Sequence, residues 1–114
     1  MTLIYKILSR AEWEAAKAAG RFEGSAVDHQ DGFIHLSAAD QAQETAARYF
    51  KDQADLVLLG IEAEGLGEAL KWEASRGGAL FPHLYRPLLI SEVLSEAALS
   101  LDADGVPRLG DHLA

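Results

Sequence analysis

Two histidines stand in short apolar segments of this chain, each surrounded by residue types found in binding and catalytic sites. His35 lies in Asp-Gly-Phe-Ile-His-Leu-Ser at residues 31–37, and His83 lies in Phe-Pro-His-Leu-Tyr-Arg-Pro at residues 81–87. An imidazole can donate or accept a hydrogen bond with little reorganisation, because its ordinary pKa lies close to neutrality. The two segments predict histidines held against a ligand. A hydrogen-bonded histidine within the core is the alternative for each.

A carboxylate stands between the two histidine segments along the chain. Glu73 follows Trp72, so strand alternation places their side chains on opposite faces. A carboxylate fixed on a strand can bind ribose hydroxyls or stabilise a developing oxocarbenium cation. In the second segment two prolines restrict the backbone, and Tyr85 beside Arg86 suits a planar or anionic ligand. The alternatives are a solvated glutamate and a turn whose aromatic rings fill the core.

Other site chemistries have weaker support. Residues 28–35 contain two aspartates and two histidines, enough donors for a divalent cation, but a turn separates the histidines and no His-x-x-x-His spacing occurs. Ser37 and Ser75 lack the Gly-x-Ser-x-Gly pattern of a hydrolase nucleophile. Residues 65–67 lack the third glycine of a phosphate-binding loop. We therefore expect no metal site.

Composition narrows the class of protein. A chain of 114 residues predicts one domain, which we expect to span residues 1–101, with residues 102–114 as a tail. The net charge is −8, from 10 basic and 18 acidic residues, which opposes an extended nucleic-acid surface and anionic membranes. Cysteine is absent, which excludes disulfides and thiolate metal sites. Without a signal sequence or a long apolar segment, we expect a soluble cytoplasmic protein.

The elements that would position these residues follow from local patterns. Strands are predicted at residues 3–8, 33–36, 56–61, 69–74 and 88–93, and the run at 56–61 is apolar enough to be covered on both faces. Ser9 and Glu12 form a capping-box pattern before a helix at residues 10–19, which Gly20 ends. Ser37 is expected to cap a second helix through residues 38–50, and residues 21–32 to form a loop.

Two helices near the N-terminus followed mostly by strands predict an α+β fold with a split mixed or antiparallel sheet. In the strand at residues 33–36, alternation places Phe33, His35 and Ser37 on one face. From Asp102 onward, turn residues predict a tail of turns or loose chain. The alternatives are a hairpin closed by residues 102–105 and a tail whose apolar residues, Leu99, Leu101, Val106 and Leu109, pack on the body.

Taken in order, these motifs resemble the DUF952 family of small bacterial proteins of unknown function. The resemblance runs from Leu3 to Val93. Its most specific feature is the presence of both Gly-Phe-Ile-His-Leu-Ser and Phe-Pro-His-Leu-Tyr in one chain. The family pattern has glycine after the tyrosine of the last motif, where this chain has Arg86.

The resemblance implies an ADP-ribosyltransferase-like fold, whose split sheet clasps NAD in a cleft. Glu73 and His35 would then be catalytic, and NAD would be bound by His35, Ser37, His83, Tyr85 and Arg86. Glu73 would stabilise the ribosyl cation as nicotinamide leaves. The acidic net charge favours a small-molecule or protein acceptor over RNA. The alternative is a non-catalytic module that binds a nucleotide, a metabolite or another protein and whose histidines are structural. Nothing in the sequence specifies an oligomeric state.

Overall fold

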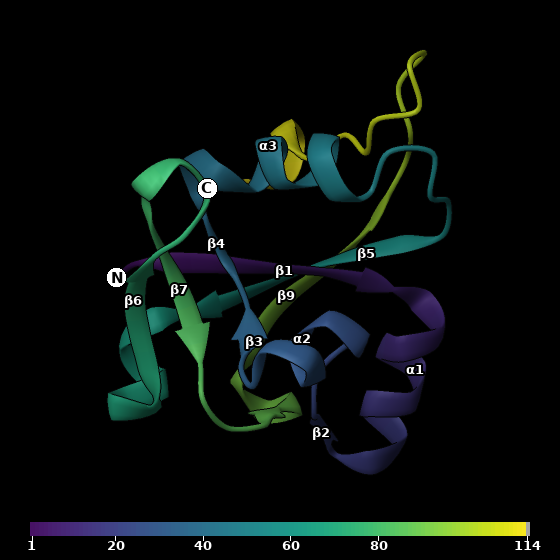
Figure 1. Ribbon diagram of the computed structural model, residues 1–114. Helices are drawn as coiled ribbons and strands as arrows, with labels where there is room; N and C mark the ends of the chain where they lie inside the picture. The colour runs from purple at the N-terminus through teal and green to yellow at the C-terminus, as the bar shows by residue number, and fades with distance from the viewer. Residues whose placement is uncertain (114) are drawn as a thin grey trace.

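The computed structural model describes residues 1–113 and shows an α+β fold whose paired strands are antiparallel (Figure 1). One sheet has the strand order β4-β1-β5-β9, formed by Ser37–Ala38, Leu3–Ser9, Leu56–Glu62 and Val93–Leu99. A second has the order β3-β7-β6, formed by Ile34–His35, Leu80–Leu84 and Leu70–Ala74. A short ladder joins β2 to β8, Arg21–Phe22 to Leu88–Leu89. The predicted α+β class with antiparallel sheets is confirmed.

Three α-helices and four short 3-10 helices complete the described chain. The α-helices are α1, α2 and α3, at Arg10–Ala19, Ala26–Asp31 and Ala39–Tyr49. The 3-10 helices η1 to η4 lie at Ala63–Ala69, Arg76–Gly78, Ile90–Glu92 and Gly110–His112. Figure 1 shows α3 on one side of the four-stranded sheet and α1 and α2 on the other, with β6 and β7 crossing near one end of β1. No helix within residues 1–113 is both long and apolar enough to cross a membrane.

The core lies on both faces of β5. Val57, Leu59 and Ile61 pack in one apolar cluster with Trp13 of α1, whereas Leu56 and Leu58 pack in a second cluster with α3 and the C-terminal segment. Side chains alternate between the faces of a strand, so one continuous apolar run supplies both clusters. The prediction that residues 56–61 are covered on both faces is confirmed.

The first helix begins and ends as the sequence indicates. The backbone N–H of Glu12 donates to Ser9 Oγ at 3.1 Å, and the backbone N–H of Ser9 donates to Glu12 Oε1 at 3.1 Å. These reciprocal bonds satisfy two backbone donors at the helix N-terminus. Gly20 follows the last turn with φ 84°, a left-handed conformation that glycine adopts without steric cost.

The predicted loop at residues 21–32 is wrong, because this segment contains β2 and α2. The backbone N–H of Ser25 donates to Asp28 Oδ2 at 2.8 Å, which fixes the first turn of α2. Gly32, at φ 87°, ends the helix and turns the chain into β3. The three-residue spacing of Ser25 and Asp28 is the same signal that identified α1, on a helix too short for apolar periodicity to reveal.

The role predicted for Ser37 as a helix cap is also wrong. Ser37 lies in β4 opposite Tyr5, and Ala38 occupies the capping position, where its backbone N–H donates to Gln41 Oε1 at 3.0 Å. Residues 34–38 therefore pass from the three-stranded sheet, through β3, to the four-stranded sheet, through β4.

The strand predicted at residues 88–93 is divided into β8, η3 and the start of β9. Glu92 causes the division, because its carboxylate accepts hydrogen bonds from the backbone N–H of Leu89 and from Arg86 and so closes a turn. Strand β9 then continues to Leu99, beyond the predicted end.

The C-terminal segment packs on the body through residue 109. Leu101 pairs with Pro107 across the turn at residues 102–105, and Leu109 is fully buried in the α3-side cluster. Of the alternatives for this tail, the described residues therefore form the hairpin and pack on the body instead of remaining loose. Ala114, the last residue of the predicted tail, lies outside them.

Candidate functional site

Strand pairing brings the two histidine segments together. His35 of β3 lies directly opposite His83 of β7, and β6 carries Glu73 on the other side of β7. Directly opposed residues on antiparallel strands have neighbouring side chains, and the two imidazole rings lie 5.8 Å apart between centroids. Residues separated by almost fifty positions in the sequence thus meet on the three-stranded sheet.

Phe33 organises the rings of this cluster. Its ring stacks on His83 with centroids 4.0 Å apart and an interplanar angle of 26°. It also contacts His35 at 4.6 Å and Tyr85 at 5.3 Å. We call Phe33, His35, Glu73, His83 and Tyr85 the histidine cluster. Alternation predicted Phe33 and His35 on one face, and their contact agrees with it.

Glu73 is the shared hydrogen-bond acceptor of the histidine cluster. Its Oε1 accepts from the Tyr85 hydroxyl at 2.6 Å and lies 2.9 Å from His83 Nδ1. The hydrogen bonds from Tyr85 and then His83 lower the pKa of the Glu73 carboxyl, and the Glu73 carboxylate raises the pKa of Tyr85. Glu73 is therefore an anion, and Tyr85 a neutral donor, at neutral pH.

His35 belongs to a network of charged side chains that extends into the core. Asp28 Oδ1 lies 2.6 Å from His35 Nδ1, and Asp31 Oδ2 lies 2.9 Å from His35 Nε2. Lys6 Nζ donates to Asp28 Oδ2 at 2.9 Å and to the backbone oxygen of His35 at 3.0 Å. This network fixes the imidazole and the strand that carries it.

Burial of the ion pair between Lys6 and Asp28, together with the contacts of the two side chains, shifts the pKa of both groups. Burial raises the pKa of the Asp28 carboxyl, but the hydrogen bonds from His35 and the charge of Lys6 more than offset it, so the pKa lies well below its usual range. Burial lowers the pKa of the Lys6 ammonium, against the opposing charge of Asp28. Two charges removed from water need this mutual compensation to remain ionised.

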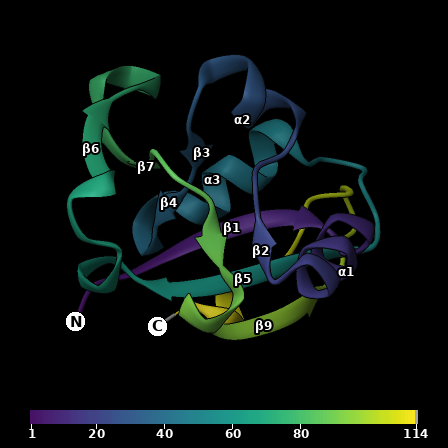
Figure 2. The same cartoon turned by 90° about the horizontal axis from the view of Figure 1, so that it is seen from below.

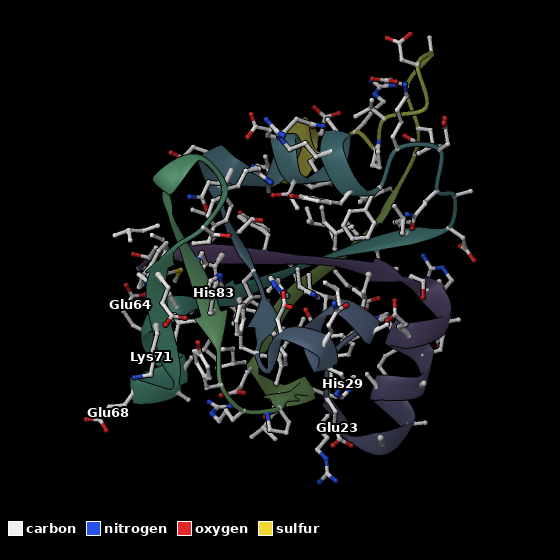
Figure 3. The ribbon with its side chains drawn as sticks, in the orientation of Figure 1. Glu23, His29, Glu64, Glu68, Lys71 and His83 are labelled. Carbon is white, nitrogen blue, oxygen red and sulfur yellow. The ribbon has the colours of Figure 1, made fainter. Side chains whose placement is uncertain are left out.

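A pocket of about 220 Å³ adjoins the histidine cluster. It lies between the α2–β3 turn and the connection from β7 to β8, and Figure 2 shows β8 beside β2 in this region. Phe33 and Tyr85 belong both to its wall and to the cluster; Figure 3 labels two more of its lining residues, Glu23 and His29, near each other and apart from His83. Of the residues predicted to bind a ligand, Tyr85 and Arg86 line this pocket.

Ser37 and Arg86 have other partners. Ser37 is buried, and its hydroxyl lies 3.0 Å from that of Thr45 on α3, away from the histidine cluster. Arg86 donates to both carboxylate oxygens of Glu92, at 2.9 and 2.7 Å, which raises the pKa of the guanidinium. The structure thus brings together His35, Glu73, His83 and Tyr85, and it places Ser37 elsewhere.

Among residues 1–113, no three or more His, Asp or Glu side chains are grouped so that they could hold a metal ion. Asp28, which the sequence offered as a ligand beside His29 and His35, instead balances the charge of Lys6.

Neither the buried position of Lys6 nor the stacking role of Phe33 is predicted from the sequence. A signal for Lys6 existed, because a lysine within an otherwise apolar strand requires a buried anion. The partner could not be named from sequence, since α2 was not recognised.

A family model described as "Protein of unknown function (DUF952)" matches residues 7–96, which include both histidine segments and Glu73. The chain belongs to the DUF952 family. Among solved structures, this DUF952 chain is similar to the crystal structure of protein CC0527 from Caulobacter crescentus, with 80% identity, a TM-score of 0.96 and 97% of each chain covered. The solution NMR structure of CC0527 shares 81% identity at a TM-score of 0.89, covering 100% of this chain and 98% of that one. No match was found among curated proteins.

Proposed function

We propose that the histidine cluster and the adjoining pocket bind a nucleotide-type ligand, NAD or ADP-ribose, and that the site transfers ADP-ribose from NAD. The observation that carries this proposal is the fixed anion of Glu73, which Tyr85 and His83 orient beside stacked aromatic rings. Tyr85 connects this anion to the pocket, because its ring lines the pocket and its hydroxyl contacts Glu73.

The chemistry of NAD suits this arrangement. Breaking the bond between nicotinamide and ribose builds positive charge on the sugar, and a fixed carboxylate stabilises that charge most in the transition state. Phe33 and Tyr85 offer aromatic surface for a planar base. In this proposal Glu73 stabilises the ribosyl cation, and His35 and His83 border the bound ribose.

The sheet arrangement supports an ADP-ribosyltransferase-like architecture within this proposal. The strands are divided between a four-stranded and a three-stranded sheet, and residues 34–38 connect the two. Arg86 is the proposed contact to the diphosphate. Because Glu92 occupies both of its terminal nitrogens, this contact requires Nε or an exchange of partners.

A second candidate function is a non-catalytic module that binds the same class of ligand. The observation that favours it is the engagement of both His35 ring nitrogens by carboxylates, with Asp28 already neutralised by Lys6. In such a module His35 holds β3 in place and reacts with nothing. The two candidates differ in whether NAD bound at the site loses nicotinamide.

An NMR titration of backbone amides with NAD and with ADP-ribose tests ligand binding. We expect saturable shifts at Phe33, at Glu73 and across residues 83–87. A nicotinamide-release assay then separates transfer from binding, with Glu73→Gln as the test variant and Glu68→Gln as the matched control on η1. Release that is lost only in Glu73→Gln supports transfer, and binding without release supports the module. No shifts at millimolar ligand would refute both.

A further inference from the structure

We propose that His83 Nε2 is the atom that accepts the proton of the ADP-ribose acceptor, and that this acceptor is a hydroxyl group. The inference rests on the proposed function and assigns to His83 a role that neither the sequence nor the family gives it. Glu73 then acts on His83 as a positioning residue, in addition to facing the ribose.

The carboxylate of Glu73 determines which nitrogen of His83 carries the proton. The lowered pKa of Glu73 keeps it ionised at neutral pH, and an ionised carboxylate can only accept hydrogen bonds. His83 Nδ1, 2.9 Å from Glu73 Oε1, must therefore be the donor. In the neutral ring the lone pair then lies on Nε2.

The same atom has no hydrogen-bond partner among the described residues. Although the His83 residue is 5% exposed, Nε2 makes no hydrogen bond within residues 1–113. No buried side-chain nitrogen or oxygen in that range lacks a partner. Nε2 therefore keeps at least a small solvent-accessible area, and this is the area through which a ligand group would contact it.

The surroundings hold this ring in one orientation. Phe33 stacks on one face at 4.0 Å, and the backbone of His83 is paired on both sides, with β3 and with β6. Figure 3 shows His83 on β7, the middle strand of its sheet. A base fixed in this way needs no reorganisation before proton transfer.

His35 is less suited to accept a proton. Its Nδ1 and Nε2 lie 2.6 and 2.9 Å from the carboxylates of Asp28 and Asp31, so neither ring nitrogen offers an unengaged lone pair. Of the two histidines in the cluster, only His83 has a ring nitrogen without a hydrogen-bond partner within residues 1–113.

The proposed step balances as follows. The bond between C1′ of the ribose and the nicotinamide nitrogen of NAD breaks, and nicotinamide leaves as a neutral molecule with the electron pair. The acceptor oxygen bonds to C1′, and its proton passes to His83 Nε2, which later returns it to water. A hydroxyl loses one proton in this step, whereas an ammonium must lose one before it can attack and a second to give a neutral product. A single base site therefore favours an alcohol, a sugar hydroxyl or water as acceptor.

Nitrogen NMR of the imidazole rings tests the first half of the inference on the unliganded protein. We expect neutral His83 to carry its proton on Nδ1, and Glu73→Ala to move that proton to Nε2. The matched control Glu68→Ala should leave the His83 tautomer unchanged. A proton on Nε2 in the wild-type ring would overturn the inference, whatever the ligand.

Nicotinamide release at saturating NAD, with glycerol added as the hydroxyl probe, tests the second half. His83→Asn keeps a nitrogen donor near Glu73 but removes the base, and we expect release to fall by about 100-fold or more. ADP-ribose binding to wild type is measured alongside it. If wild type binds ADP-ribose but His83→Asn releases nicotinamide at the wild-type rate, the inference fails and the proposed function stands. If wild type does not bind, the proposed function fails and the inference fails with it. Glyceryl and water products are separated to identify the acceptor.

Discussion

Lys6 and Asp28 form an ion pair at 2.9 Å in which the two side chains are only 6% and 1% exposed. The pair joins the central strand β1 to the short helix α2, and Asp28 in turn holds His35 through both its ring and its backbone N–H. This buried charge pair thus connects the stability of the fold to the position of His35.

Replacing one member of this pair should be costly. In Lys6→Met the carboxylate of Asp28 loses its buried counter-charge, and we expect the free energy of unfolding to fall by about 3–5 kcal/mol. Urea denaturation measures this change. Lys51→Met is the matched control, because Lys51 is exposed and has no ion pair within residues 1–113. Equal stability of the two variants would contradict a structural role for the pair.

The contribution of Asp28 should be visible in the pH dependence of the free energy of unfolding. Its pKa in the folded protein is depressed below the unfolded value of about 3.9, so its contribution is present above that pH and is lost as the pH falls. We expect wild type to lose stability from about pH 5 downward, and Asp28→Asn to lose less. Glu64, Glu73 and Glu92, whose carboxyl pKa values are also lowered, add to the acid sensitivity. Parallel curves from urea melts at several pH values would exclude Asp28 as a contributor.

Phe33 should matter more for ligand binding than for folding. Phe33→Leu keeps an apolar side chain but removes the ring that contacts His83 and Tyr85. We expect the Kd for ADP-ribose to rise by about 3- to 10-fold, the size of an aromatic contact beyond its buried area. Calorimetric titration measures the Kd. Phe50→Leu is the control, since Phe50 packs against the α3-side cluster; the same loss in both variants would place the effect in folding.

Tyr85 should control the charge state of Glu73. In Tyr85→Phe the carboxylate loses its shortest hydrogen bond, at 2.6 Å. We therefore expect the pKa of Glu73 to rise toward its ordinary value, with the His83 contact retaining part of the depression. Carbon NMR of the side-chain carboxyl groups follows this titration directly. Tyr49→Phe, on α3, should leave the Glu73 titration unchanged, and an unshifted Glu73 in Tyr85→Phe would remove Tyr85 from this role.

The sequence predicted those helices and strands whose structure is decided by residues close to one another in the chain. Ser9, Glu12 and Gly20 fix the ends of α1 within one segment, and the apolar residues of β5 identify a strand covered on both faces. Ser37 shows the limit of this approach, because a serine before a helical pattern reads as a cap. Pairing with Tyr5, more than thirty residues away, makes it a strand residue.

The residues of the candidate site were predictable from the sequence, but most of their hydrogen-bond partners were not. His35, Glu73, His83 and Tyr85 were identified by residue type within apolar segments, and strand pairing brings them together. The partners that fix His35 and Arg86 are Asp28 and Glu92. They lie seven and six residues away along the chain, across connections between elements where no regular spacing predicts a contact. Whether the five predicted ligand contacts bind NAD stays a prediction.

Residues 34–38 belong to two sheets, with β3 paired to β7 and β4 paired to β1. Separation of β3, which carries His35, from β7 therefore also disturbs the pairing of β4 with β1 in the four-stranded sheet. Local opening of the site and opening of the core should then behave as one cooperative unit in amide hydrogen exchange. A ligand that stabilises the pairing of His35 with His83 would therefore slow amide hydrogen exchange in β1 as well. Binding at the site would then be detectable on the far side of the molecule without any change of shape.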